Sequence, residues 1–282
     1  MTTDPAPKDP VIVALAERWH RSRARRLARG AVALALTLGI GGLAAAQSPG
    51  LGEHCRDVTH GGERYMVCSF SPETHAVSLH LRGADGRPMG SLRELERATG
   101  PFVMAMNAGM YRDDLSALGL YVEDGDEQER LITSDGWGNF HLLPNGVFHV
   151  SRGENGVQRF GVTETRAFAA NPPAGLAHAT QSGPMLVIGG KLHPRFLPKS
   201  NSLKIRNGVG VSPDGRVHFA ISRGVVRFHD FATLFRDVLD APDALFLDGT
   251  ISAFRAGARR QGGWRAIGPM IAVRERDAAS SR

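Results

Sequence analysis

The sequence predicts an α+β fold: a single domain in which a mixed, mainly antiparallel sheet packs against two or three helices. Many short apolar runs are separated by Gly, Pro, Asn and Asp residues, which is the pattern of antiparallel strands joined by turns. Helical spacing of apolar residues is limited to a few segments. A chain of 282 residues is also long enough to bury a sizeable core.

Strands are expected where short apolar runs lie between turn residues. They cover 64–70, 76–81, 102–106, 118–123, 140–143, 147–150, 157–162, 207–211, 217–221, 243–247 and 270–273. Hairpin turns are expected at Pro144-Asn145-Gly146 and at 212–215, because both carry turn residues. Residues 47–62 are expected to form a loop that leads into the fold. Residues 193–206 are polar and basic without a clear period, which indicates a mobile loop or a binding loop.

Three segments are expected to be helical. Residues 91–99 begin with Ser91 and carry Glu94 three positions later, which makes a capping box. Residues 164–169 are long enough for a helical turn. Residues 230–239 form the clearest helix, because apolar side chains recur at three-four spacing along one face: Phe231, Leu234, Phe235, Val238 and Leu239.

Residues 1–46 are predicted to be an export signal. An arginine-rich stretch over 18–29 precedes an apolar run over 31–43, and small residues follow it. The alternative is an uncleaved membrane anchor formed by residues 31–46, which is short for a bilayer span. We therefore expect an exported protein, periplasmic or extracellular, with residues 47–282 as its folded domain.

The net charge of +6 is mostly a property of this leader. Seven of the 34 basic residues and three of the 28 acidic residues lie within 1–46, so 27 basic and 25 acidic residues remain. A balance this even does not indicate nucleic-acid binding, and no nucleic-acid partner is expected.

The two cysteines, Cys55 and Cys68, bracket a short turn region just after the leader. In an exported protein this arrangement favours a disulfide. A metal site or a nucleophilic thiol is the alternative, and the sequence has no CxxC pair and no further sulfur ligands to support it.

Several motifs follow one another along the chain. They are Phe102-Val-Met-Ala-Met-Asn-Ala-Gly-Met-Tyr111, Gly138-Asn-Phe140, Pro144-Asn-Gly146, Gln181-Ser-Gly-Pro-Met185, Arg206-Asn-Gly-Val-Gly210, His229-Asp-Phe-Ala232, Leu234-Phe-Arg-Asp237 and Leu247-Asp-Gly249. In this order they resemble the phosphodiester glycosidase family, in its bacterial envelope branch. That family includes the lysosomal uncovering enzyme, which removes N-acetylglucosamine from a phosphodiester cap on mannose. The resemblance covers nearly all of the chain after the leader.

The resemblance implies an exported hydrolase that cleaves a sugar–phosphate diester or a related glycosidic bond in envelope polysaccharide. Asp248 is the candidate catalytic carboxylate, since it ends an apolar strand in a Gly-bearing turn. Its role as nucleophile, base or metal ligand stays open, and so does the presence of a divalent cation as cofactor. The alternative for Asp248 is an Asx-type turn. His229 is a second candidate acid or base, with a purely structural role as its alternative.

Arg206 is the candidate phosphate ligand, because a guanidinium matches phosphate oxygens with two parallel hydrogen bonds. A surface arginine in a basic loop is the alternative. The further candidates for substrate binding combine amides that bond sugar hydroxyls with backbone and hydroxyl donors in glycine-bearing turns. They are Asn107, Gly109, Asn139, Ser182, Gly183, Asn207, Gly249 and Ser252.

Two other functions are consistent with the sequence. Many family members continue with glycines after the Asp-Gly pair, where this chain has Thr250 and Ile251. That departure motivates a non-catalytic glycan-binding or envelope-assembly protein on the same fold. A metal-dependent phosphodiesterase ranks last, because the sequence has no compact His/Asp metal signature. The expected partner is a carbohydrate or glycosyl phosphate, and membrane contact is expected only through an uncleaved leader.

Overall fold

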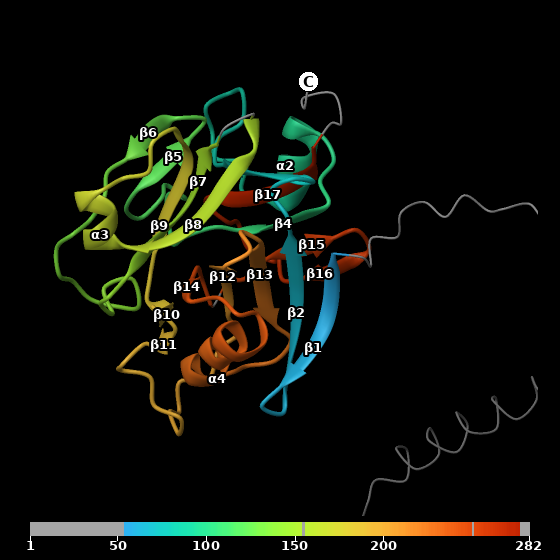
Figure 1. The fold of residues 1–282 in the computed structure, drawn as a ribbon. Helices are drawn as coiled ribbons and strands as arrows, with labels where there is room; N and C mark the ends of the chain where they lie inside the picture. The colour runs from blue at the N-terminus through green and yellow to red at the C-terminus, as the bar shows by residue number, and fades with distance from the viewer. Residues whose placement is uncertain (1–53, 154–155, 250, 277–282) are drawn as a thin grey trace, which may run out of the picture. The chain divides into compact units, whose positions relative to one another are not determined.

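Three antiparallel sheets form the body of the protein (Figure 1). The computed structural model describes residues 54–153, 156–249 and 251–276. The predicted export signal over residues 1–46 lies outside them. Within the described residues, no helix is both long and apolar enough to cross a membrane.

The largest sheet has seven strands in the order β1-β2-β13-β12-β14-β10-β11. In chain order these are β1 (Cys55–His60), β2 (Glu63–Phe70), β10 (Met185–Ile188), β11 (Lys191–Leu192), β12 (Asn207–Val211), β13 (Val217–Ser222) and β14 (Asp243–Phe246). The strand β14, which leads to Asp248, lies inside this sheet between β12 and β10. Its position is therefore fixed from both sides by backbone hydrogen bonds.

Two five-stranded sheets complete the β structure. One has the order β16-β15-β4-β17-β3, from β3 (His75–His80), β4 (Met104–Asn107), β15 (Phe254–Ala256), β16 (Arg259–Gln261) and β17 (Met270–Glu275). The other has the order β6-β5-β9-β7-β8, from β5 (Tyr121–Glu123), β6 (Asp126–Glu129), β7 (Gly146–Arg152), β8 (Gln158–Glu164) and β9 (Leu176–Ser182). Every pair of these described strands is antiparallel.

Each sheet has a helix on one face. The helices are α2 (Leu92–Thr99), α3 (Thr165–Ala170) and α4 (Phe228–Thr233), and α4 continues into a π-helix, η2 (Leu234–Val238). Leu95 of α2 packs on β4 and β17, Phe168 of α3 packs on β5, β7 and β9, and Phe231 of α4 packs on the seven-stranded sheet. Among the described residues the protein is mainly β with three α-helices, in agreement with the two or three helices that the sequence predicts. Three wholly antiparallel sheets stand in place of the single mixed sheet that was expected.

The main core lies between the three sheets, on the faces that point away from the helices. One continuous buried cluster draws Met106 from β4, Phe148 from β7 and Phe219 from β13, and Phe219 lies edge-to-face with Phe148. Burial of large apolar side chains from all three sheets is the main term that stabilises their arrangement. It also brings the ends of β4, β12 and β14 close together.

Local signals in the sequence are confirmed at several elements. Ser91 caps α2, where its hydroxyl accepts a hydrogen bond from the Glu94 N–H at 3.2 Å. The hairpin of β12 and β13 turns at 212–215, and Gly215 has a φ of 82°. The expected helix over 230–239 begins two residues earlier, at Phe228, and its second half is π-helical.

Two expectations about the chain are wrong. Residues 55–60 are strand β1, not a loop, because Gly61 and Gly62 both have positive φ and turn the chain back onto β2. Residues 140–143 form a turn instead of a strand, and Gly146 starts β7 instead of closing a hairpin. The buried Asn145 side chain donates to the Phe140 carbonyl at 3.0 Å, which stabilises that turn.

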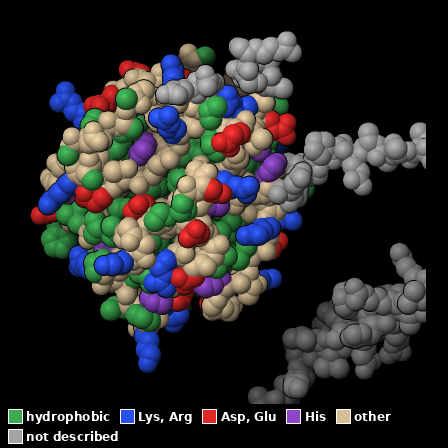
Figure 2. Space-filling view, viewed as in Figure 1, with side chains coloured by type: hydrophobic (Ala, Val, Ile, Leu, Met, Phe, Trp, Pro, Cys, Tyr) green, Lys and Arg blue, Asp and Glu red, His purple; other side chains and the backbone are tan. Residues whose placement is uncertain are grey.

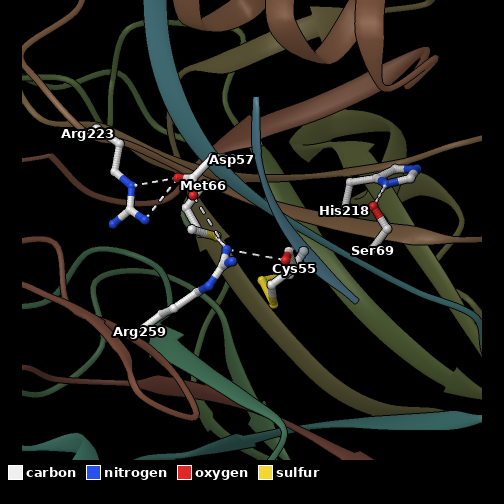
Figure 3. The surroundings of a disulfide bond; sticks show 8 residues. Cys55, Asp57, Met66, Ser69, His218, Arg223 and Arg259 are labelled. Atoms are coloured by element: carbon white, nitrogen blue, oxygen red, sulfur yellow. Dashed lines mark hydrogen bonds and ion pairs between the residues drawn. A yellow bond between two sulfur atoms is a disulfide. The ribbon is translucent and has the colours of Figure 1, made fainter. Parts of the chain in front are cut away.

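Cys55 and Cys68 form the predicted disulfide (Figure 3). They lie opposite each other in the register of β1 and β2, so the bond ties the edge strand β1 to its neighbour. Asp57 on β1 forms ion pairs with Arg223 and Arg259. On the molecular face shown in Figure 2, basic and acidic side chains are interspersed, as the nearly balanced charge of residues 47–282 predicts.

Candidate functional site

Asp248 stands two residues beyond the end of β14, where the strand pairing becomes irregular. The Leu247 N–H donates to the Asn207 carbonyl at 3.1 Å, whereas the Asn207 N–H donates to the Asp248 carbonyl at 3.0 Å. The Leu247 carbonyl, left out of this pairing, accepts a hydrogen bond from the Ser182 hydroxyl at 2.8 Å. The irregularity is therefore fully hydrogen-bonded, and it re-aims the chain at Asp248.

Two buried asparagines hold this turn. The Asn207 Oδ1 accepts from the Asp248 N–H at 2.7 Å, and its Nδ2 donates to the Asn107 Oδ1, also at 2.7 Å. The same Asn107 oxygen accepts from the Ala253 N–H at 2.9 Å. Both side chains are fully buried. One amide pair thus ties β4 of one sheet and β12 of another to the segment that carries Asp248.

The segment after Asp248 is stabilised from within. The Gly249 N–H donates to the Asp248 Oδ1 at 2.5 Å, and the Ser252 hydroxyl donates to the Gly249 carbonyl at 2.9 Å. The first contact joins Asp248 to the next residue, one position short of the Asx turn that the sequence offered as an alternative. Asp248 is half-buried and lines a pocket.

The Asp248 side chain lines a pocket of about 440 Å³. Around it are Met110, Tyr111, Arg112, Asp113, Leu115, Leu118, Ile251, Arg265 and Ala266. The volume suits a small-molecule site. We call it the carboxylate pocket.

Burial controls the protonation of this pocket. It raises the pKa of Asp248 above its usual value, and the Gly249 N–H opposes that shift. Burial first, and then the nearby Asp248 charge, raise the pKa of the Tyr111 phenol to about 12. At neutral pH, Tyr111 is therefore a neutral hydrogen-bonding group beside the carboxylate.

A second pocket, of about 390 Å³, adjoins the first. It is lined by Ile205, Arg223, Gly249, Ile251, Ser252, Gln261, Gly262, Gly263, Trp264 and Arg265. The two pockets share Ile251 and Arg265. The segment from Asp248 to Ser252 therefore borders both.

The structure brings together six of the residues that the sequence singles out: Asn107, Ser182, Asn207, Asp248, Gly249 and Ser252. Of these, Asp248, Gly249 and Ser252 line a pocket, whereas the two asparagines and Ser182 are buried supports. The hydrogen bonds of these three side chains position the segment that carries Asp248.

Arg206 does not reach these pockets. Its Nε donates to the Val226 carbonyl at 3.0 Å, its Nη2 donates to the Ser202 carbonyl at 2.9 Å, and its guanidinium lies 3.5 Å from the centre of the Phe228 ring. Burial lowers the pKa of Arg206 to about 10. These contacts favour a structural role, since the side chain anchors the loop over 193–206 onto α4.

His229 and Asn139 also lie apart from Asp248. His229 is on α4, where its Nδ1 contacts the Asp230 carboxylate at 3.1 Å. Asn139 is exposed in the turn before Phe140. Neither lines the carboxylate pocket or its neighbour.

Gly109 and Gly183 are explained by packing. A Cβ atom on Gly109 would lie 2.4 Å from the Gln181 carbonyl oxygen, and one on Gly183 would lie 2.5 Å from the Phe140 carbonyl oxygen. Both positions therefore require glycine for close approach of two backbones. Their role is to place the motif after β4 against β9 and the turn at Phe140.

Two pocket residues, Tyr111 and Arg265, were not singled out from the sequence. Tyr111 closes the first family motif, which was a usable signal. Arg265 follows Gly262-Gly263-Trp264 without any feature that separates it from the other arginines. Among the described residues, no group of three or more His, Cys, Asp or Glu side chains is placed to hold a metal ion.

Comparisons with known proteins agree with this fold and with the motifs. Escherichia coli (strain K12) has a relative, uncharacterized protein YigE, that is 37% identical over 187 residues, covering 65% of this chain and 71% of the relative. The catalytic domain of zebrafish N-acetylglucosamine-1-phosphodiester alpha-N-acetylglucosaminidase, auto-inhibited by its pro-peptide, has a TM-score of 0.56 at 14% identity. The match covers 79% of this chain and 82% of that one.

A further structure, a Burkholderia pseudomallei K96243 protein to which export is attributed, has a TM-score of 0.53 at 12% identity. The match covers 75% of this chain and 74% of the Burkholderia chain. At such identities the two solved structures show the fold alone. The phosphodiester glycosidase family model matches residues 101–274, which include every pocket residue near Asp248. The chain therefore belongs to the phosphodiester glycosidase family.

Proposed function

We propose that the protein is an exported hydrolase that cleaves the glycosidic bond of a sugar–phosphate diester in envelope polysaccharide. One observation carries the proposal: a half-buried carboxylate, Asp248, and a cationic side chain, Arg265, line the same pocket. A glycosyl phosphodiester needs both, because the anomeric carbon must be attacked and the phosphate must be held. Family membership supports the same class of substrate.

Asp248 is proposed to act as a general base. It takes a proton from a water molecule as the water oxygen bonds to the anomeric carbon, and the bond from that carbon to the phosphate oxygen breaks. The electron pair stays on the oxygen, so the phosphate leaves as a monoester and the sugar keeps the new hydroxyl. Burial suits Asp248 to this role, because a raised pKa makes a carboxylate a stronger base.

Arg265 is proposed to hold the phosphate. Its side chain is exposed, and among the described residues it has no hydrogen bond or ion pair. The guanidinium is therefore available for a bidentate contact with phosphate oxygens. Arg112, on the same pocket, is already engaged, since it donates to Ser116 and pairs with Glu129. That difference favours Arg265 over Arg112 as the anion ligand.

Export is supported by two features of this chain and by one relative. The leader has the three parts of an export signal, and the Cys55–Cys68 disulfide suits an oxidising compartment. Export is also attributed to the structurally similar protein from Burkholderia pseudomallei. We infer a periplasmic or extracellular protein whose substrate is a component of the envelope.

The test is release of reducing sugar from methyl N-acetylglucosamine-1-phosphate by the full chain. Asp248→Asn is expected to lower kcat by about 100-fold or more, the usual cost of losing a general base. Asp243→Asn is the matched control, because Asp243 lies at the other end of β14 and its Oδ1 accepts from the Gly189 N–H. Full activity of Asp248→Asn would reject the assignment, and glycan binding without turnover on a broad substrate panel would favour the binding-protein alternative.

A further inference from the structure

The pocket beside the carboxylate pocket contains an exposed tryptophan. Trp264 lines it, and this residue is 94% exposed. A large aromatic side chain in water costs free energy that burial would recover. An exposed indole at the wall of a pocket is therefore a candidate binding surface, in contrast to scattered exposed apolar residues.

The turn that carries Trp264 is anchored at both ends. Gly262 has a φ of 69°, and a Cβ atom there would lie 1.7 Å from the Ser252 carbonyl oxygen, so only glycine fits. At the other end, the Tyr111 hydroxyl donates to the Ala266 carbonyl at 3.3 Å. Trp264 is thus presented from a turn that rests on the segment after Asp248 and on the wall of the carboxylate pocket.

The polar wall of this second pocket is pre-organised. The Arg223 Nε and Nη2 donate to the Asp57 Oδ1 at 3.1 and 3.0 Å, as Figure 3 shows. The Arg223 Nη1 lies 3.4 Å from the Gln261 Oε1, and the Gln261 Nε2 donates to the Ser222 carbonyl. Planar polar side chains held in place by neighbours lose little entropy when they bind a ligand.

We propose that this second pocket is a subsite for the leaving group, in which a pyranose ring stacks on Trp264 and its hydroxyls face Arg223 and Gln261. Because Arg265 and Ile251 belong to both pockets, a phosphate at Arg265 joins a sugar beside Asp248 to a second ring beside Trp264. A pyranose has one apolar C–H face and a polar rim, which matches an indole on one wall and amide and guanidinium groups on the other. The assignment of this ring as the leaving group rests on the proposed function; the binding of the ring does not.

The kinetic test uses two substrates with the same glycosyl phosphate. One is the methyl ester, and the other is the 6-ester of a hexopyranose. In Trp264→Ala, the ratio of kcat/KM for the hexose ester to that for the methyl ester is expected to fall about tenfold, the size of a lost stacking contact. Trp137→Ala is the matched control, because Trp137 is 97% exposed and lines neither pocket. An unchanged ratio in Trp264→Ala would overturn the subsite.

The binding test separates the subsite from the reaction. Hexopyranose 6-phosphate, titrated into the full chain, is expected to quench tryptophan fluorescence in the wild type and in Trp137→Phe. In Trp264→Phe the quench is expected to disappear. A quench that depends on Trp264 without any hydrolysis would reject the proposed function and keep the subsite. Hydrolysis of both esters with a quench that survives Trp264→Phe would keep the function and reject the subsite.

Discussion

Asn107 and Asn207 are 100 positions apart in the chain, and their side chains share a hydrogen bond of 2.7 Å. Asn107 ends β4 in one sheet, and Asn207 begins β12 in another. Because Asn207 also accepts from the Asp248 N–H, the contact between two sheets determines where the candidate catalytic carboxylate stands. The position of Asp248 therefore depends on a tertiary contact and not on its own turn alone.

Replacement of Asn207 by alanine should weaken both fold and site. In Asn207→Ala the Asp248 N–H loses its acceptor, and the Asn107 Oδ1 loses one of its two donors. The free energy of unfolding should therefore drop by about 2 kcal/mol. Urea denaturation measures this, and kcat should fall with it as the carboxylate loses its support. The control is Asn201→Ala, at an exposed loop position, which should change stability by less than about 0.5 kcal/mol. Equal losses in the two variants would contradict the bridging role of Asn207.

The charge on Asp248 should reduce stability while it serves catalysis. A folded-state pKa above the unfolded value means that the folded protein holds the proton more tightly, so ionisation costs stability as the pH rises through that pKa. Asp248→Asn should therefore unfold at a higher urea concentration than the wild type at pH 8. The difference should vanish near pH 3, where the carboxyl is protonated in both states. An asparagine variant that is less stable at pH 8 would contradict this sign.

The same raised pKa should appear in the activity of the wild type. A general base works only when ionised, so kcat/KM should fall as the pH drops through the pKa of Asp248. The acidic limb of the pH profile should therefore lie above the ordinary aspartate value of about 3.9. Initial rates between pH 3 and 9 (roughly the range over which carboxylates and histidines titrate) measure this limb. A limb at or below the ordinary value would mean that another group is the base.

Sequence patterns predicted the elements whose signals are local. The capped helix α2 and the hairpin of β12 and β13 needed only a capping residue and a turn. Strand β1 was missed because Cys-Arg-Asp-Val-Thr-His is polar, and it becomes a strand through pairing with β2 and a disulfide. Residues 140–143 were predicted to be a strand because three of the four are apolar, but a local hydrogen bond from the Asn145 side chain to the Phe140 carbonyl stabilises a turn there.

At the site, the position of a residue was more predictable than the direction of its side chain. Asp248 lies just beyond the end of a buried strand, where the sequence places it, and it lines a pocket. Arg206 and Asn207 are adjacent, yet the amide bonds Asn107 whereas the guanidinium lies over Phe228. Charge alone does not reveal which of several arginines faces a pocket, because that depends on alternation along the strand and on loop paths.

Substitutions at Arg206 and Arg265 should distinguish the arginine that stabilises the fold from the arginine that binds the substrate. Arg206→Met removes donors to two loop carbonyls and a cation–π contact, so it should lower the free energy of unfolding by about 2 kcal/mol. Arg265→Met should leave stability within about 0.5 kcal/mol, since the side chain is exposed. It should instead raise KM for a glycosyl phosphodiester about tenfold or more, by loss of a charged hydrogen bond to phosphate. A raised KM in Arg206→Met at full stability, with none in Arg265→Met, would restore Arg206 as the phosphate ligand.

The disulfide should stabilise the whole fold through the hairpin of β1 and β2. Cys55 and Cys68 are 13 positions apart, and a loop of that size is worth about 3 kcal/mol when closed by a covalent bond. The double variant Cys55→Ala/Cys68→Ala should lose that amount in urea denaturation. Reductant should lower the stability of the wild type by a similar amount and should leave the double variant unchanged, which separates loss of the bond from loss of side-chain packing.

Because Asp57 lies on the same strand, a frayed β1 should also loosen Arg223, so binding of hexopyranose 6-phosphate should weaken in the double variant. Unchanged stability in the double variant would show that strand pairing alone is enough to hold β1.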